Sequence, residues 1–132
     1  MSWSIETKIE EDTLVITLVG EADKTEYLAL RERVRSILEK ASLRHVLLDL
    51  RRAVLHASML DVFEVARSNP NAIPSNVKYA VVFSPETLSI QNVELGENVA
   101  RNRGADLRAF TDISEARNWL TGEPNTEVEV AQ

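Results

Sequence analysis

The sequence predicts a single α/β domain with a mainly parallel sheet of four to five strands, an antiparallel N-terminal edge strand and about four helices. First, two β-branched runs flank Glu11 and Asp12 at the start of the chain, which is typical of a hairpin. Second, short apolar runs then alternate with helical patterns, and such steps form right-handed crossovers between parallel strands. Third, no repeat or long linker divides residues 1–122, so we expect one domain followed by a mobile acidic tail at 123–132.

The opening hairpin and the first helix follow from two different periodicities. Apolar or β-branched side chains alternate with polar ones from Trp3 to Ile9, and a second strand runs over 13–19, with Gly20 expected to end it. A helix is predicted over 24–41, capped by Asp23 or Thr25. Its apolar residues recur in steps of three and four, whereas the arginines at 31, 33 and 35 are expected to be solvated. The helical stripe consists of Tyr27, Leu30, Val34, Ile37, Leu38 and Ala41.

The middle of the chain contains a central strand and a second helix. The almost wholly apolar run His45–Leu50 is typical of a strand covered on both faces. The residues after it are predicted to form a loop that leads into a helix over 58–68. Two prolines and several turn formers predict a further loop over 69–76.

Two strands and two helices complete the predicted domain. A buried strand over 77–83 is followed by Ser84 and Pro85, which favour a helix start, and that helix is expected to run to about residue 103, with Gly104 at its C-cap. A last strand covers 106–110. The spacing of Asp112 and Glu115 predicts a capping box at the start of a final helix, which Gly122 ends.

Composition restricts the classes of function. The formal net charge of −6 disfavours binding to nucleic-acid phosphates. The chain has no cysteine, which excludes disulfides, thiol catalysis and thiolate metal sites. No apolar run reaches the roughly 18 residues that a membrane span needs, and the N-terminus has no signal-peptide pattern. We therefore expect a cytoplasmic protein without a membrane span.

The residues that carry catalysis in other proteins do not form a recognisable pattern. His45 and His56 are eleven positions apart and are not expected to meet, and no G-x-S-x-G turn or glycine-rich phosphate loop is present. Asp49 and Asp61 are the carboxylates nearest to the expected strand-end crevice, where solvation or capping is the usual role. The sequence therefore predicts a protein that is not an enzyme and holds no metal or cofactor.

Several segments together resemble the STAS domain, the fold of the bacterial anti-sigma factor antagonists. The likeness covers about residues 3–121 and rests on the turn Gly20–Asp23, the strand Val46–Leu50 with its L-D-L pattern, and the final strand and helix from Phe110 to Leu120. The layout looks closest to the divergent SpoIIAA-like branch. That branch lacks the family's serine motif and has been linked to binding of a lipid or small apolar ligand.

The resemblance also implies a position for a regulatory modification. In the family, a D-[ST]-[ST]-G motif follows the central strand, and a partner kinase that is also an anti-sigma factor phosphorylates its first hydroxyl. This sequence has Ala57-Ser58-Met59-Leu60 there, so Ser58 stands at the phosphorylated position while the aspartate and the glycine are replaced. Ser58 is therefore either a phosphorylation position or an N-cap of the second helix.

Three functional hypotheses remain open from the sequence. The first is a regulatory module that docks a protein partner, such as a kinase-type regulator, through Arg51, Arg52, Leu55, His56, Ser58, Met59 and Leu60. The second is a binder of a lipid or small apolar ligand, with the 69–76 loop as a lid at the strand ends. The third is an enzyme that holds an anionic substrate through Arg51 and Arg52, which otherwise are solvated residues on a loop. A second copy of the chain could also pair with the edge hairpin, where Trp3 is expected to be exposed.

Overall fold

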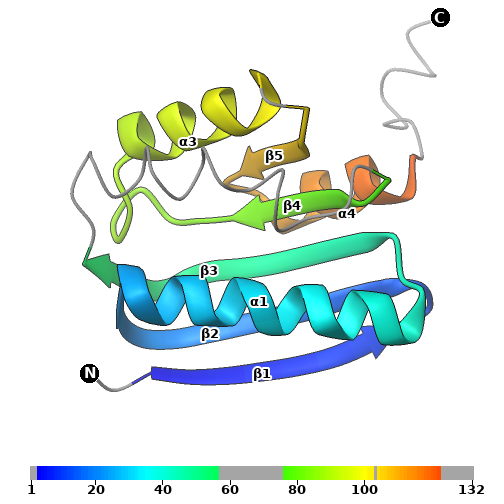
Figure 1. Cartoon of the computed structure of the whole chain (residues 1–132). Helices are drawn as coiled ribbons and strands as arrows, with labels where there is room; N and C mark the ends of the chain where they lie inside the picture. Colours follow the sequence, from blue (N-terminus) through cyan, green and yellow to red (C-terminus); the bar gives the residue numbers. More distant parts are fainter. Residues whose placement is uncertain (1–2, 57–75, 103, 123–132) are drawn as a thin grey trace, which may run out of the picture.

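One mixed five-stranded sheet organises the molecule (Figure 1). The computed structural model describes residues 3–56, 76–102 and 104–122. The strands follow one another across the sheet in chain order. β1 is antiparallel to β2 and the other neighbours are parallel, as predicted. The strands are β1 (Trp3–Glu10), β2 (Thr13–Asp23), β3 (His45–His56), β4 (Lys78–Val82) and β5 (Asp106–Phe110).

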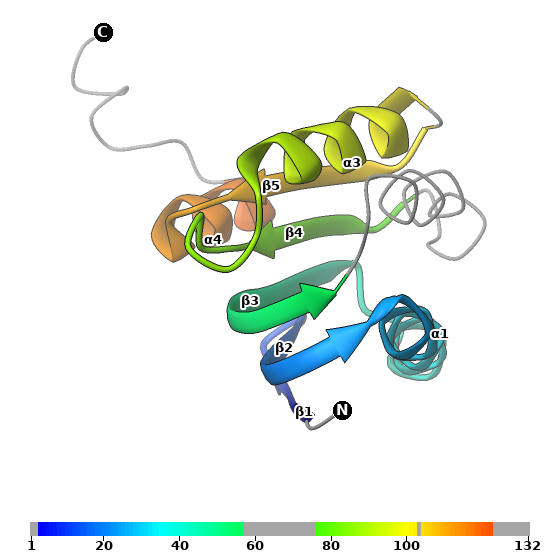
Figure 2. The ribbon, with the colours of Figure 1, turned by 90° about the vertical axis from the view of Figure 1, so that its left-hand side faces the viewer.

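The helices lie on both sides of this sheet. Figure 2 shows α1 (Lys24–Ala41) and α4 (Ile113–Thr121) on opposite faces, and α3 (Ile90–Asn102) packs against β5. The predicted helix over 58–68, most of the loop over 69–76 and the acidic tail at 123–132 lie outside the described residues. Across the described ranges, no helix combines the length and apolar character that a bilayer span requires.

Two apolar cores hold the layers together. The larger lies between the sheet and α1 and includes Ala100 of α3, and the smaller lies under α4. The larger core contains Leu14, Ile16 and Leu18 of β2, Val46 and Leu48 of β3, and Leu30, Val34 and Leu38 of α1. α4 packs on β3, β4 and β5, and the carboxyl half of β3 is exposed at Arg51, Arg52 and Val54.

The helix ends confirm most of the predicted caps. Asp23 and Glu26 form a reciprocal capping box at the start of α1, and the Asp112 side chain accepts two backbone N–H bonds at the start of α4. After α3, the N–H of Gly104 donates to Arg101 and the next N–H donates to Ala100. This pair of bonds is the Schellman motif that glycine favours, and Gly104 has the positive φ it requires.

Two strand ends and one helix start differ from the prediction. β2 continues past Gly20, whose φ of 109° glycine adopts without strain, and β3 continues past Leu50 to His56. The strands extend together because Ala53 and Leu55 pack against the α1 core. The loop predicted after Leu50 is therefore wrong. Likewise, Pro85 lies in a turn, and α3 begins five residues later.

Two side chains are more buried than the sequence indicates. Trp3, predicted to be exposed, is partly buried against the α1 core. Arg31 is only 7% exposed, whereas Arg33 is exposed and Arg35 forms exposed ion pairs on the surface of α1, as predicted. Burial raises the pKa of Tyr27, and the positive charge of Arg31 offsets part of that rise. Arg31 therefore belongs to the interior of the domain.

Candidate functional site

A β-bulge in β3 builds the surface that the sequence singled out. Thr17 of β2 pairs with Asp49, but Val19 pairs with Arg52, so β3 has one more residue than β2 between these pairs. An extra residue of this kind shifts the alternation of side chains between the two faces of a strand. As a result, the consecutive residues Arg51 and Arg52 both lie on the α4 side of the sheet, next to Asp49.

Asp49 stabilises the bulge through its carboxylate. Oδ1 accepts the backbone N–H of Arg51 at 3.1 Å, and the Arg51 guanidinium donates to both carboxylate oxygens, with Nε–Oδ1 and Nη2–Oδ2 distances of 2.9 and 2.8 Å. An extra residue in a bulge has no partner on the neighbouring strand. The L-D-L pattern of the central strand therefore supplies the acceptor that the displaced backbone needs, in a bidentate geometry suited to arginine.

The ion pair shifts the ionisation of both partners. Burial alone would raise the pKa of Asp49, but hydrogen bonds from Arg51 and the charges of Arg51 and Arg52 together hold this pKa below its usual value. The hydrogen bond to Asp49 raises the pKa of Arg51, and the charge of Asp112 contributes to the rise. Both groups are therefore fully charged at neutral pH.

Replacing Asp49 by asparagine is expected to lower the free energy of unfolding by about 1 kcal/mol at neutral pH. Bonds to charged groups contribute more than neutral ones, but the Arg51 side chain is 42% exposed, so solvent screens the pair. Because the folded-state pKa of Asp49 is lowered, its stabilisation is present above about pH 4 and is lost as the pH falls through that pKa.

Urea unfolding at pH 7 and at pH 3 measures this effect. The difference between wild type and the Asp49→Asn variant should shrink at the lower pH. The Arg35→Gln variant is a matched control, because its ion pairs on α1 are exposed and should contribute less than about 0.5 kcal/mol. A difference for Asp49→Asn that is equally large at both pH values would contradict the proposed role of the carboxylate charge.

The other residues predicted for this surface differ in their exposure, and three of them lie outside the described residues. His56 is exposed, and its Nε2 lies 2.6 Å from Oε1 of Glu21 on β2. Leu55 is partly buried against the α1 core, so it exposes less of its side chain than its neighbours on β3. Ser58, Met59 and Leu60 lie outside the described residues. Val54 is 36% exposed and was not predicted for this surface, because no sequence pattern indicates the bulge that turns it outward.

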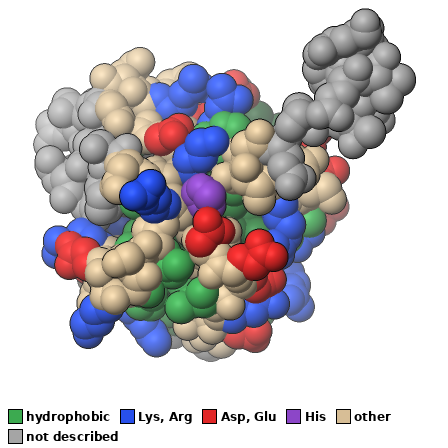
Figure 3. Space-filling view, turned by 90° about the vertical axis from the view of Figure 1, so that its right-hand side faces the viewer, with side chains coloured by type: hydrophobic (Ala, Val, Ile, Leu, Met, Phe, Trp, Pro, Cys, Tyr) green, Lys and Arg blue, Asp and Glu red, His purple; other side chains and the backbone are tan. Residues whose placement is uncertain are grey.

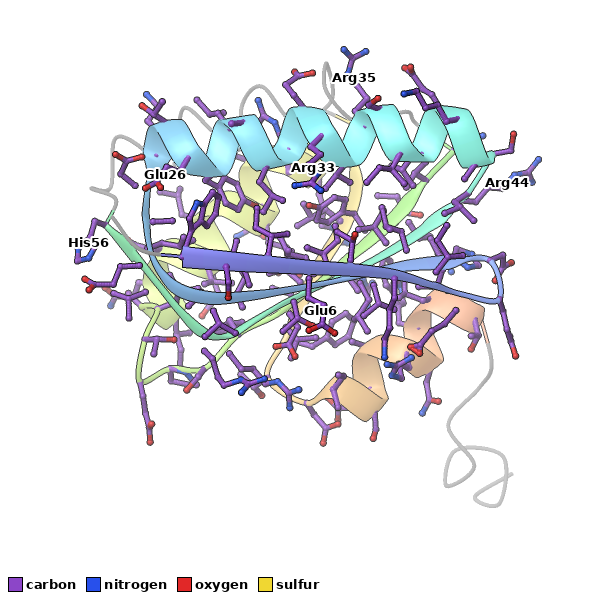
Figure 4. All side chains as sticks on the ribbon, turned by 90° about the horizontal axis from the view of Figure 1, so that it is seen from below. Glu6, Glu26, Arg33, Arg35, Arg44 and His56 are labelled. Atoms are coloured by element: carbon purple, nitrogen blue, oxygen red, sulfur yellow. The ribbon has the colours of Figure 1, made fainter. Side chains whose placement is uncertain are left out.

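The described residues offer little for acid–base or metal chemistry at this surface. His45 and His56 are the two ends of β3, roughly 35 Å apart along an extended strand, so they do not meet, as predicted. Figure 4 shows His56 at one end of the molecule and Arg44, the neighbour of His45, at the other. Within the described ranges, no three histidine or acidic side chains are grouped as metal ligands would be.

A shallow hollow lies at the opposite end of the sheet, near the turn between β1 and β2. Most of its lining is polar, and Figure 3 shows acidic and basic side chains side by side over this end of the molecule. A lining of this composition does not suit an apolar ligand. The hollow is lined by Glu10, Glu11, Thr13, Arg117, Leu120 and Thr121.

Comparison with known proteins identifies the fold. No protein-family model matches the chain, and no curated protein matches its sequence. An anti-sigma factor antagonist from Mycobacterium paratuberculosis superposes with a TM-score of 0.63 at 14% identity, over 91% of this chain and 95% of that one. A protein of the DUF3478 family from Shewanella loihica, with a SpoIIAA-like fold, gives 0.54 at 19% identity, over 89% and 93%.

A third solved structure agrees with these two. The anti-sigma factor antagonist SpoIIAA in its unphosphorylated form superposes with a TM-score of 0.52 at 14% identity, over 92% of this chain and 99% of that one. All three matches span nearly the whole of both chains, as expected for a shared fold. The chain therefore has the STAS fold of SpoIIAA and the anti-sigma factor antagonists.

Proposed function

We propose that this chain is a non-catalytic regulatory module that docks another protein through the sheet face around the bulge of β3. We call this face the bulge surface, and it consists of Arg51, Arg52, Val54 and His56. The observation that carries the proposal is that two consecutive arginines are exposed on a hydrogen-bonded strand. A strand fixes the direction of both side chains at low entropic cost, which favours recognition over a flexible contact.

The chemistry of the bulge surface favours binding over catalysis. A general base works best when its pKa lies near the working pH, but the pKa of Asp49 is lowered and its carboxylate is fully occupied by Arg51. His56 is exposed and lies against a carboxylate at the rim of the sheet. These groups position a surface and do not form a reactive centre.

The charges of the bulge surface indicate the chemistry of the partner. Asp49 neutralises Arg51, while Arg52 has no ion-pair partner among the described residues and lies two positions before the exposed Val54. Arginine beside an apolar side chain is a common combination at the centre of protein interfaces. The surface fits a partner segment that presents a carboxylate next to an apolar side chain.

The shared fold supports this class of function. Two of the matching structures are anti-sigma factor antagonists, proteins that by their names act on other proteins. Ser58 follows His56 by two positions and remains part of the proposal as a phosphorylation position or helix cap. A phosphate there would add negative charge close in sequence to Arg52 and His56, and would therefore compete with the carboxylate of a partner.

Reversing the charge of Arg52 is expected to weaken partner binding at least about tenfold. The Arg52→Glu variant replaces an attraction by a repulsion at the centre of the bulge surface, which typically costs 2 kcal/mol or more. A partner is first captured with the wild-type protein, and its affinity for purified variants is then measured by calorimetry. The Arg33→Glu variant is the matched control, because it makes the same change at an exposed position of α1.

Crosslinking locates the contact independently of affinity. A photoreactive amino acid at Val54 should crosslink the captured partner, and the same group at Arg33 should not. Equal affinities of the two charge-reversal variants, together with crosslinking from the α1 position alone, would contradict docking at the bulge surface. Turnover of a small anionic substrate that is lost in Arg52→Glu would instead favour an enzyme.

A further inference from the structure

The outer edge of β1 has no pairing partner within the described structure. β1 is the last strand on its side of the sheet, and Figure 4 looks directly onto it, with α1 on one side and α4 on the other. Ile9 is 53% exposed on this strand. Unpaired strand edges present rows of free N–H and C=O groups that can bind another strand.

The opposite edge of the sheet is protected. β5 is the last strand on that side, and the N–H of Ala109 donates to Oε2 of Glu97 on α3 at 2.7 Å. The C=O of the next residue, Phe110, accepts a bond from the N–H of Phe83, directly after β4, so the N–H of Ala109 points to the outer edge. A side chain of α3 thus occupies an edge donor of β5, whereas β1 is free to pair.

The hairpin geometry identifies which backbone groups of β1 point outward. Glu10 and Thr13 close a two-residue turn, so they form a hydrogen-bonded pair, and such pairs alternate with non-hydrogen-bonded pairs along the ladder. The even-numbered residues of β1 therefore bond to β2. The N–H and C=O groups of Ile5, Thr7 and Ile9 point away from the sheet.

The side chains of β1 are also ordered so that two antiparallel copies of the strand place favourable pairs opposite each other. When a second β1 lies antiparallel with Thr7 opposite Thr7, Ile5 faces Ile9 of the second copy, and Glu6 faces Lys8 in both directions. The Thr7 and isoleucine pairs are the hydrogen-bonded ones, so Glu6 and Lys8 fall in non-hydrogen-bonded pairs, where side chains approach most closely. Sliding the second strand by two residues in either direction, the smallest shift that keeps the outward backbone groups paired, places Glu6 opposite Glu6 or Lys8 opposite Lys8.

From this complementarity we propose that the partner of the β1 edge is a second copy of the chain, which forms a two-fold dimer with a continuous ten-stranded sheet. Glu6 points toward the α4 side of the sheet in Figure 4, away from α1. The Lys8 side chain is 57% exposed, which leaves it accessible to a second copy, and its Nζ lies 3.7 Å from Oε1 of Glu10 on its own strand. The bulge surfaces of both copies remain free, because they lie on β3 and not on β1.

A charge-swap series tests the partner and the register together. Glu6→Lys and Lys8→Glu should each raise the dimer dissociation constant at least about tenfold, because each turns two attractive pairs into repulsive ones. The double variant exchanges the two charges and should restore wild-type dimerisation. In the shifted registers it would leave like charges opposed, so recovery is specific to the proposed alignment.

The dissociation constants are measured by analytical ultracentrifugation of the full chain between about 1 µM and 1 mM, the range in which small interfaces associate. Glu86→Lys is the matched control for Glu6→Lys, since it makes the same change at an exposed turn position far from β1 and should leave dimerisation unchanged. Circular dichroism verifies that each variant is folded.

Hydrogen exchange gives a readout that does not depend on charge. The amides of Ile5, Thr7 and Ile9 should gain protection as concentration rises, while those of Glu6 and Lys8 are protected at every concentration by β2. Thr7→Pro should abolish dimerisation and leave the hairpin intact, because it removes an outward N–H only. A chain that stays monomeric throughout the range, or a dimer that neither the charge series nor Thr7→Pro weakens, overturns the proposal.

Discussion

Replacing Leu48 by alanine is expected to lower the free energy of unfolding by about 3 kcal/mol. Leu48 is fully buried in β3 between the sheet and α1. Truncation of such a residue removes apolar contacts and leaves a cavity that the surrounding core closes only partly, which typically costs 2–5 kcal/mol. The loss is a large fraction of the 5–15 kcal/mol that stabilises an ordinary domain.

Urea unfolding followed by circular dichroism measures the effect, with Ile90→Ala as the matched control. Ile90 is a large apolar residue too, but it is 47% exposed at the start of α3. Its truncation should change stability by less than about 0.5 kcal/mol. Similar losses in the two variants would contradict the assignment of Leu48 to the main core.

The order of strands and helices was predictable because each element carries its own periodicity. The short run from Val46 to Leu50 is apolar except for Asp49, which is typical of a central strand, whereas the stripe from Leu30 to Leu38 repeats at helical spacing. The helix caps were predictable because they too depend only on nearby residues. Asp23 with Glu26, and Gly104 after α3, act through bonds to residues within a few positions of themselves.

The candidate site was only partly predictable, because a bulge is a property of two strands and not of one. Arg51 and Arg52 interrupt the apolar run, so the sequence alone indicates a loop after Leu50. Pairing with β2 turns that interruption into a shift of register, with Asp49 as the internal acceptor. The alternation of Ala53 and Leu55 was the available signal that the strand continues, but it is too short to read without its partner strand.

Arg31 was predicted to be solvated but is buried. Arg31 lies on α1 directly beside Leu30, and a sequence pattern assigns a charged residue to the solvated side of a helix. Its charge lowers the pKa of Tyr79 on β4, a residue almost fifty positions further along the chain, so the fold brings the two residues close together. Contacts between distant segments of this kind have no local signature.

Tyr79 is expected to make the domain unstable at alkaline pH. It is 2% exposed, and burial, together with the neighbouring Tyr27, raises its pKa well above its ordinary value, with the charge of Arg31 opposing the rise. The unfolded chain releases this proton near pH 10, while the folded chain keeps it. Stability is therefore complete below pH 10 and falls by about 1.4 kcal/mol per pH unit above it from this residue alone.

The Tyr79→Phe variant separates this effect from general alkaline unfolding. At pH 8 its stability should lie within about 1 kcal/mol of wild type, because only one hydroxyl is lost. Near pH 11.5 the variant should have gained about 2 kcal/mol relative to wild type, since no proton remains to be released at this position. Lysines titrate equally in both proteins and cancel in the comparison. Absorbance at 295 nm should show tyrosinate only as the circular dichroism signal is lost, and ionisation of Tyr79 near pH 10 in the folded protein would refute its burial.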